Sequence, residues 1–243
     1  MVDDRPHTES AQTKDVVKVV MRGAVTSFRY PHFIQGVQPT YEMPPPSTIY
    51  GHLCSATGQY EPPENIEFAV HFTYAAKQRD VEHTHLSVPY IQANPFQREL
   101  LFFPRLTLYI APVYYLEAFR APHYPVVLGR SQDLMTYESV EVITLNLADQ
   151  AYFEHTLIPA IDAPYFQRSI GVTMARFIQP ESRQPEWGQY AILKDRVLYP
   201  PDDALPDVYY PSIWIDTDED DSTTKEPYKG RHRGLIFQRF VAP

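Results

Sequence analysis

The sequence predicts an α+β fold, in which a small antiparallel sheet carries helices on one face and a second β-rich region packs behind it. The first half of the chain gives the order strand, helix, strand, long excursion, strand. The 24 prolines against 9 glycines, with 18 Tyr and 13 Phe, favour short strands joined by rigid, irregular loops. With 243 residues, 44% of them hydrophobic, the chain is long enough for a packed core.

The first predicted elements are a buried strand and a helix. Residues 1–15 are polar, without the apolar stretch of a secretory signal, and are expected to be a disordered lead-in. The β-branched run VVKVVMRGAV predicts a strand at 16–25. Three consecutive prolines forbid a helix before Pro46, which suits the first helical turn, and Gly58 is expected to end that helix.

The later elements follow from alternating apolar patterns and from prolines. Further strands are predicted at 66–77, 99–111, 189–198 and 234–241, and a short helix at 115–121. The stretch 78–98 is polar and aromatic with two prolines, so it is expected to be a long excursion outside the core. These patterns divide the chain into a first domain at 16–150 and a β-rich region at 151–243.

The charge of the chain restricts its partners. A net charge of −9 argues against binding nucleic acid alone, although much of the acid is local, in an expected loop at 216–229 that contains Asp216, Asp218, Glu219, Asp220 and Asp221. The 15 arginines outnumber the 6 lysines, and arginine makes planar, bidentate contacts to phosphate. Such a chain can hold RNA if partner subunits supply the remaining positive field.

The single cysteine excludes a disulfide scaffold and favours a reducing cytoplasm. Cys54 falls in a stretch with helical apolar spacing, so it is expected to be a small buried residue rather than a catalytic thiol. No run approaches the roughly 18 apolar residues of a membrane span, so no membrane partner is expected.

Three segments, in order, resemble one known family. They are GAVTSFRYPHF followed by TYEMPPPSTIYGHLCSATG, then RELLFFPRLTLYI, then VVLGRSQDLMTYESV. Together they are similar to the fifth Cas family, the small RAMP (repeat-associated RNA-binding) subunit at the foot of type I CRISPR Cascade complexes, in the style of the I-B group. The resemblance spans residues 16–145, and the acidic C-terminal region matches nothing in the family pattern.

The resemblance implies a ferredoxin-like, RRM-type domain with a β-hairpin thumb at 78–98 and a variable C-terminal β region. It implies a non-catalytic protein that caps the 5′ handle of the crRNA and bridges the backbone and large subunits of Cascade. Target DNA near the protospacer-adjacent motif is then reached through the complex. No cofactor is implied, and the expected location is the cytoplasm.

RNA handles are bound by arginine contacts to phosphate, aromatic stacking and hydrogen bonds to splayed bases. The predicted RNA-binding residues are Ser27, Phe28, Arg29, Tyr30, Arg105, Gly129, Arg130, Ser131 and Gln132. The predicted thumb residues are Arg79, His83, His85, Tyr90, Phe96 and Arg98. Replacing Arg29 or Arg130 with alanine is expected to weaken handle binding and leave the fold intact.

Each prediction has a plainer alternative. Arg29 is equally compatible with a solvated surface charge, and Phe28 with a core position. The run LGRSQD at 128–133 fits a simple turn closed by an Asx-type bond from Asp133. A further alternative discards the resemblance and leaves an acidic α+β protein that binds a protein partner through its aromatic loops.

Catalysis is the main competing hypothesis, because one branch of the family cleaves the crRNA precursor without metal. Such cleavage needs a general base, a general acid and oxyanion stabilisation, commonly from Tyr, His and Lys. His32, His52 and Tyr50 lie near the motifs, but Lys18 and Lys77 are the only lysines between 15 and 193 and no Tyr-Lys-His arrangement is visible. We therefore expect no catalysis and a separate processing endonuclease.

A metal site is not expected. His83 and His85 share one face of a strand, with His71 and Glu82 as further ligands. Structural zinc takes four ligands, usually with cysteine, and no cysteine lies near these histidines.

Overall fold

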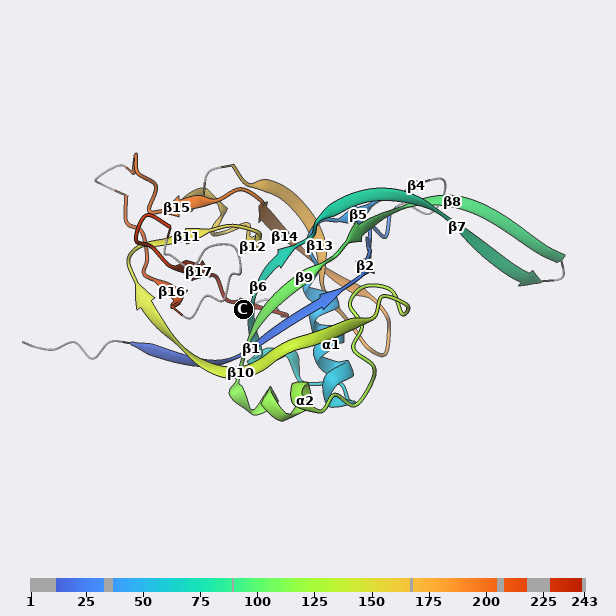
Figure 1. Cartoon of the computed structure of the whole chain (residues 1–243), viewed down its shortest axis with the longest axis horizontal. Coiled ribbons are helices and arrows are strands. Elements are labelled where there is room, and N and C mark those ends of the chain that lie inside the picture. The colour runs from blue at the N-terminus through green and yellow to red at the C-terminus, as the bar shows by residue number, and fades with distance from the viewer. Residues whose placement is uncertain are drawn as a thin grey trace, which may run out of the picture.

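The computed structural model describes residues 12–32, 37–88, 90–166, 168–204, 208–217 and 228–241, with the side chains of 83–94 excepted. Most described residues lie in strands, and helices are few and short (Figure 1). The mixed, β-rich architecture confirms the predicted class at this level.

The central sheet has the strand order β10-β1-β9-β6, and each neighbouring pair is antiparallel. Its strands and the helices between them are β1 (Thr13–Gly23), α1 (Pro46–Thr57), β6 (Glu67–Thr73), β9 (Arg105–Ala111), α2 (Leu116–Arg120) and β10 (Met135–Ala148). In the chain, α1 therefore separates β1 from β6, and α2 separates β9 from β10. The helices therefore cover one face of the sheet, and the opposite face is not covered by them.

The sheet extends beyond both sides of this centre and curls (Figure 1). It continues past β10 through β16 (Ile213–Asp216), β17 (Arg233–Leu235), β11 (Ala151–Phe153) and β15 (Val197–Tyr199), and past β6 to β18 (Gln238–Arg239). A separate sheet packs with α1 and contains β12 (Thr156–Pro159), β13 (Ile170–Ile178) and β14 (Pro185–Leu193). The 3-10 turns are η1 (Pro63–Asn65), η2 (Val113–Tyr115) and η3 (Ala163–Tyr165).

The excursion expected at 78–98 is a long antiparallel hairpin. It consists of β7 (Ala76–Val88) and β8 (Tyr90–Phe102), paired in register from Ala76–Phe102 to Val88–Tyr90. Figure 1 shows it projecting well beyond the body of the molecule. The short strands at its base and beside it are β2 (Val25–Thr26), β3 (Phe28–Arg29), β4 (Val37–Gln38) and β5 (Thr40–Tyr41).

Side-chain alternation along β1 sorts the two faces of the sheet. Val17, Val19 and Met21 are buried in the main core against the helix side. The intervening Lys18 and Arg22 therefore point to the opposite face. This face is polar towards the hairpin, and its other end is covered by the apolar side chains Val16, Ala69, Tyr109, Ile143, Leu145 and Leu235.

The helix prediction is confirmed in its details. α1 begins at Pro46, and its C-cap Gly58 adopts φ +78 while its N–H donates to the carbonyl of Cys54 at 2.9 Å. Cys54 itself is buried, as expected. Proline and glycine alone predicted both ends of this helix, because each residue acts on the local backbone.

Several predicted boundaries are wrong. β1 begins at Thr13, inside the expected lead-in, and the Lys14 ammonium lies 2.5 Å from Glu67. The strand expected at 66–77 ends at Thr73, because the hairpin starts at Ala76. The strands expected at 189–198 and 234–241 are each divided in two, β14 and β15, β17 and β18. Asp216 is the last residue of β16 rather than part of the acidic loop, and most of that loop lies outside the described residues.

Candidate nucleic-acid interface

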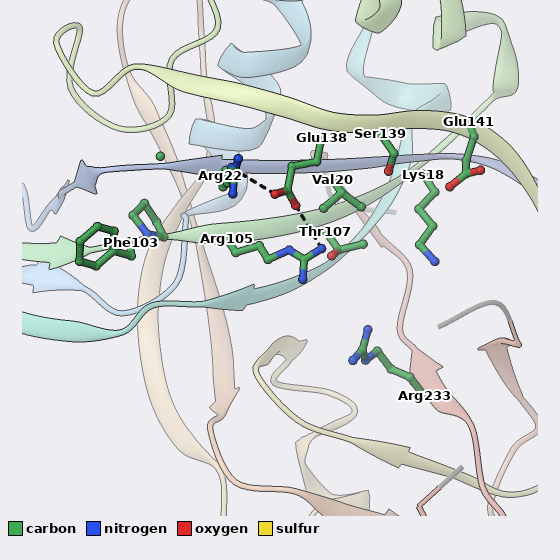
Figure 2. A pocket seen from close by; sticks show the side chains of 12 residues that line it. Lys18, Val20, Arg22, Phe103, Arg105, Thr107, Glu138, Ser139, Glu141 and Arg233 are labelled. Carbon is green, nitrogen blue, oxygen red and sulfur yellow. Dashed lines mark ion pairs between the residues drawn. The ribbon is translucent and has the colours of Figure 1, made fainter. Parts of the chain in front are cut away.

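The polar half of the sheet face forms a pocket of about 650 Å³, which we call the sheet-face pocket. Figure 2 shows it running from the corner after β8, across β1, β9 and β10, to Arg233 on β17. Its lining residues are Lys18, Val20, Arg22, Gly23, Phe103, Pro104, Arg105, Thr107, Glu138, Ser139, Glu141 and Arg233. In a chain of net charge −9, this pocket gathers four cationic side chains against two carboxylates on its lining.

The hairpin end of the pocket has an excess of guanidinium over carboxylate. Arg22 Nε lies 3.1 Å from Oε1 of Glu138, and Arg105 Nη2 lies 3.1 Å from its Oε2, so two cations share a single carboxylate (Figure 2). The Arg22 side chain is 70% exposed, which leaves its remaining N–H groups open to solvent. Two guanidiniums around one carboxylate make a net positive patch suited to a phosphate.

The far end of the pocket rests on a buried ion pair. Lys18 Nζ lies 2.6 Å from Asp216 Oδ2, and the Tyr109 hydroxyl donates to the same oxygen at 2.6 Å. The two charged side chains are only 6% and 1% exposed. Burial and the Asp216 carboxylate raise the pKa of Tyr109 well above its usual value, so the phenol stays protonated. This cluster links β16 to β1 and fixes Lys18 on the pocket lining.

His71 lies on the same face of β6, opposite Thr107 in register. Burial, with the nearby positive charge of Arg233, holds the pKa of His71 well below its usual range. Its imidazole is therefore neutral at pH 7. The positive charge of this face comes from arginine and from Lys18.

The predicted segment 27–30 is divided between core and surface. Ser27 and Phe28 are buried, and the Phe28 ring contacts Phe72 edge to face at 5.5 Å between centroids. Phe28 therefore takes the core alternative and offers no open ring to a base in this conformation. Arg29 is exposed, and the Tyr30 ring stacks on Tyr41 at 3.6 Å.

The predicted loop 129–132 is a rigid turn built around Asp133. Asp133 is fully buried, and its carboxylate accepts the backbone N–H groups of Ser27 at 3.2 Å and Arg130 at 2.9 Å. The Arg130 guanidinium donates to both carboxylate oxygens, with distances of 2.7 Å from Nη2 and 3.0 Å from Nε. Ser131 and Gln132 are exposed at the tip of the turn. A turn closed by Asp133 is therefore present, but its carboxylate accepts N–H groups that precede it in the chain, so the turn is not of the Asx type; Arg130 is engaged by it.

Gly129 is required by this turn. Its φ is +103, and an added Cβ would lie 2.5 Å from Thr26 Oγ1 and 2.8 Å from the carbonyl oxygen of Ser27. The glycine lets β10's leading turn close onto the strand segment 25–28. It positions neighbouring groups rather than offering a side chain to RNA.

The hairpin residues are only partly described. Arg79 is exposed at the hairpin base, 3.6 Å from Glu99. Arg98 is buried, pairs with Glu82 and lies over the Phe96 ring at 5.1 Å. The predicted side chains of His83, His85 and Tyr90 lie outside the described residues.

The structure brings together one predicted residue, Arg105, with several that the sequence analysis missed: Lys18, Arg22, Phe103 and Arg233. Lys18 and Arg22 are four residues apart on a predicted strand, and this even spacing indicates that their side chains share one face of the sheet. Arg233 carried no such signal, because its place depends on how the sheet curls.

The acid–base candidates lie in separate contacts. His52 is buried, with Nδ1 3.0 Å from the carbonyl oxygen of Val127, and the Tyr137 hydroxyl donates to its Nε2 at 2.9 Å. The Tyr50 hydroxyl donates to the carbonyl oxygen of Glu61 at 2.6 Å. The imidazole of His32 stacks near Trp187, 5.1 Å between centroids. Within the described ranges, no helix is long and apolar enough to cross a membrane, and no three metal-ligating side chains gather into a site.

The structure is similar to a chain from a solved CRISPR RNA-guided surveillance complex, with a TM-score of 0.52 and 12% identity over 76% of this chain and 90% of that chain. It is also similar to the crystal structure of a CRISPR protein from Archaeoglobus fulgidus, with a TM-score of 0.51 and 10% identity over 93% of this chain and the whole of the other. At such identities the likeness shows a shared fold. No protein-family model and no curated protein matches the sequence.

Proposed function

We propose that this chain is a non-catalytic, RNA-binding subunit of a type I CRISPR Cascade surveillance complex, which holds the 5′ handle of the crRNA. The observation that carries the proposal is the sheet-face pocket, where Arg22 and Arg105 share one carboxylate on an otherwise acidic protein. The shared fold with a chain of a CRISPR RNA-guided surveillance complex supports it. Fold alone does not assign function, so the pocket and the fold are needed together.

We infer that the central strands form a ferredoxin-like, RRM-type core. The strand order β10-β1-β9-β6, with α1 and α2 as the two crossovers, is the order expected of that βαββαβ arrangement. RRM-type sheets bind single-stranded RNA on the face away from the helices, and the sheet-face pocket lies there. In this proposal the β7–β8 hairpin is the thumb.

The acidity of the chain favours binding within an assembly. Counterion release by a few arginines gives modest affinity, and a net charge of −9 opposes it at long range. We therefore expect the Cascade backbone and large subunits to supply further cationic surface, and target DNA near the protospacer-adjacent motif to be reached through the complex.

The absence of catalysis is part of the proposal. It is supported by the engagement of the Tyr50 and His52 side chains in hydrogen bonds to backbone carbonyls, apart from the sheet-face pocket. A general base must reach the proton that it removes, and these side chains face the core.

The test is affinity purification through this chain after co-expression with the neighbouring Cascade subunits and a CRISPR array. A stoichiometric complex carrying a discrete guide RNA is expected. Arg22→Ala should weaken RNA retention and lower the salt dependence of binding by a log–log slope of about 0.7, the value for one phosphate contact on a single strand. Arg120→Ala is the matched control, since Arg120 is exposed on α2 and pairs with Glu117, three residues before it.

Two outcomes would count against the proposal. Recovery of the chain alone, with neither RNA nor partners, would remove the Cascade assignment. Cleavage of repeat RNA by the purified chain, without a processing endonuclease or divalent metal, would replace the non-catalytic role with that of an endoribonuclease.

A further inference from the structure

An exposed aromatic ring stands at the hairpin end of the sheet-face pocket. Phe103 lies in the corner between β8 and β9, and its residue is 68% exposed. Figure 2 shows Phe103 at the opposite end of the pocket from Arg233. The ring is thus offered to whatever enters the pocket beside Arg22 and Arg105.

The backbone of this corner is held in a conformation that suits glycine. Phe103 has φ +52, in the left-handed region that bulky residues rarely adopt. Two hydrogen bonds fix it: the N–H of Phe103 donates to the carbonyl of Ala24 at 2.8 Å, and the N–H of Gly23 donates to the carbonyl of Pro104 at 3.0 Å. The surrounding chain therefore determines this geometry, whatever side chain stands at position 103.

Stability does not explain phenylalanine at this position. The ring is mostly in water, so it contributes little apolar burial, and the left-handed backbone disfavours a Cβ. Strained, exposed residues of this kind concentrate at binding sites, where the surrounding structure tolerates the strain. The position of the ring in the pocket therefore indicates a binding role for phenylalanine here, since packing gives no reason for it.

We propose that Phe103 is a base-stacking residue, and that a nucleobase of single-stranded RNA lies on its ring while the adjoining phosphates contact Arg22 and Arg105. This inference rests on the proposed RNA-binding function and names the chemistry of one subsite. Every base has a π face, so a single ring serves without sequence preference.

The lining of the pocket favours RNA over a protein side chain as the occupant. A partner's apolar residue would bury the guanidiniums beside the ring and leave only Glu138 to pair with them. A nucleotide satisfies both requirements, because its base is flat and apolar on its faces and its phosphate is anionic.

The test uses the co-purified complex and two readouts, RNA affinity and melting temperature of the chain. Phe103→Gly removes the ring and suits the left-handed backbone, so the melting temperature should not fall. RNA affinity should fall about 5- to 150-fold, the loss typical of one base–aromatic stack. Phe103→Trp should retain affinity. Tyr60→Ala is the matched control, since Tyr60 is 65% exposed and lies after α1, outside the pocket.

Photo-crosslinking identifies the occupant directly. Guide RNA carrying 5-iodouridine in the handle should crosslink to Phe103, and the crosslink should be lost in Phe103→Gly and kept in Tyr60→Ala. Unchanged RNA affinity in Phe103→Gly, or crosslinks that map only elsewhere, would overturn the inference while leaving RNA binding in place. Loss of a partner subunit with RNA still bound would make position 103 a protein contact and overturn it as well. A wild-type complex without RNA would instead overturn the proposed function.

Discussion

Arg130 and Arg29 were predicted to bind RNA in the same way, and the structure separates them. Asp133 is fully buried and takes two guanidinium hydrogen bonds from Arg130, whose side chain is only 18% exposed. Arg130→Ala leaves that carboxylate buried with the backbone N–H groups of Ser27 and Arg130 as its remaining donors. The expectation that this variant leaves the fold intact is therefore replaced by a prediction of lost stability.

The magnitude follows from the contacts that remain. Removing one partner of a buried ion pair costs about 3–5 kcal/mol. Because two backbone donors stay and the guanidinium is partly exposed, we expect about 2–3 kcal/mol for Arg130→Ala. For a chain of this size that lowers the melting temperature by about 4–12 °C. Urea titration followed by circular dichroism measures the same free energy of unfolding.

Arg29→Ala is the matched control, since Arg29 is exposed. Its stability should change by less than about 0.5 kcal/mol, as for most surface substitutions. If Arg29 contacts phosphate in the complex, RNA affinity should fall by about 1.5–3 kcal/mol. An Arg130→Ala variant as stable as the parent would refute the reasoning, because Asp133 would then not depend on its guanidinium.

Three further predictions concern stability. Asp216→Ala should lower the free energy of unfolding by about 3–5 kcal/mol, because it leaves Lys18 buried without its carboxylate. Adding Lys18→Met should recover part of that loss, as measured by a double-mutant cycle. Losses of stability that simply add in the double variant would contradict the pairing. Deleting residues 80–96 should leave the body folded, and a molten circular dichroism spectrum would show that the hairpin is part of the core. Burial lowers the pKa of His52 to about 4. The unfolded chain then takes up a proton on this imidazole that the folded chain does not, so the stability contributed by His52 should be fully present above about pH 6.5 and fall by roughly 2 kcal/mol by pH 5. Because burial also keeps His71 neutral, His52→Gln should reduce the slope of stability against pH without abolishing it.

The proposed RNA-binding role requires an acidic protein to present a local positive surface, and the sheet-face pocket has one. Its four cations lie on β1, β9 and β17 along one face of the sheet, and two of them, Arg22 and Arg105, share the single carboxylate of Glu138. Such an arrangement is expected to raise local positive potential without changing the overall charge. In the proposed function, the remaining subunits are expected to supply the affinity that the chain lacks alone.

The sequence by itself determined the elements whose cause is local. Pro46 and Gly58 set the ends of α1, because proline and glycine restrict or free the backbone where they stand. The β-branched run at 16–25 predicted β1, because branched side chains fit a pleated strand. Absence of core periodicity marked the excursion that forms β7 and β8.

Only the tertiary structure decided which distant groups meet. Lys18 and Asp216 are 198 positions apart, and their pairing depends on the curl that brings β16 and β17 over the sheet. The same holds for Arg130, whose role is set by the burial of Asp133, and for Phe103, whose left-handed backbone is imposed by Ala24 and Gly23. Local sequence patterns determine the backbone conformation and burial of a segment. Which charged side chains meet across strands depends on the strand order of the whole fold, and no single segment specifies that order.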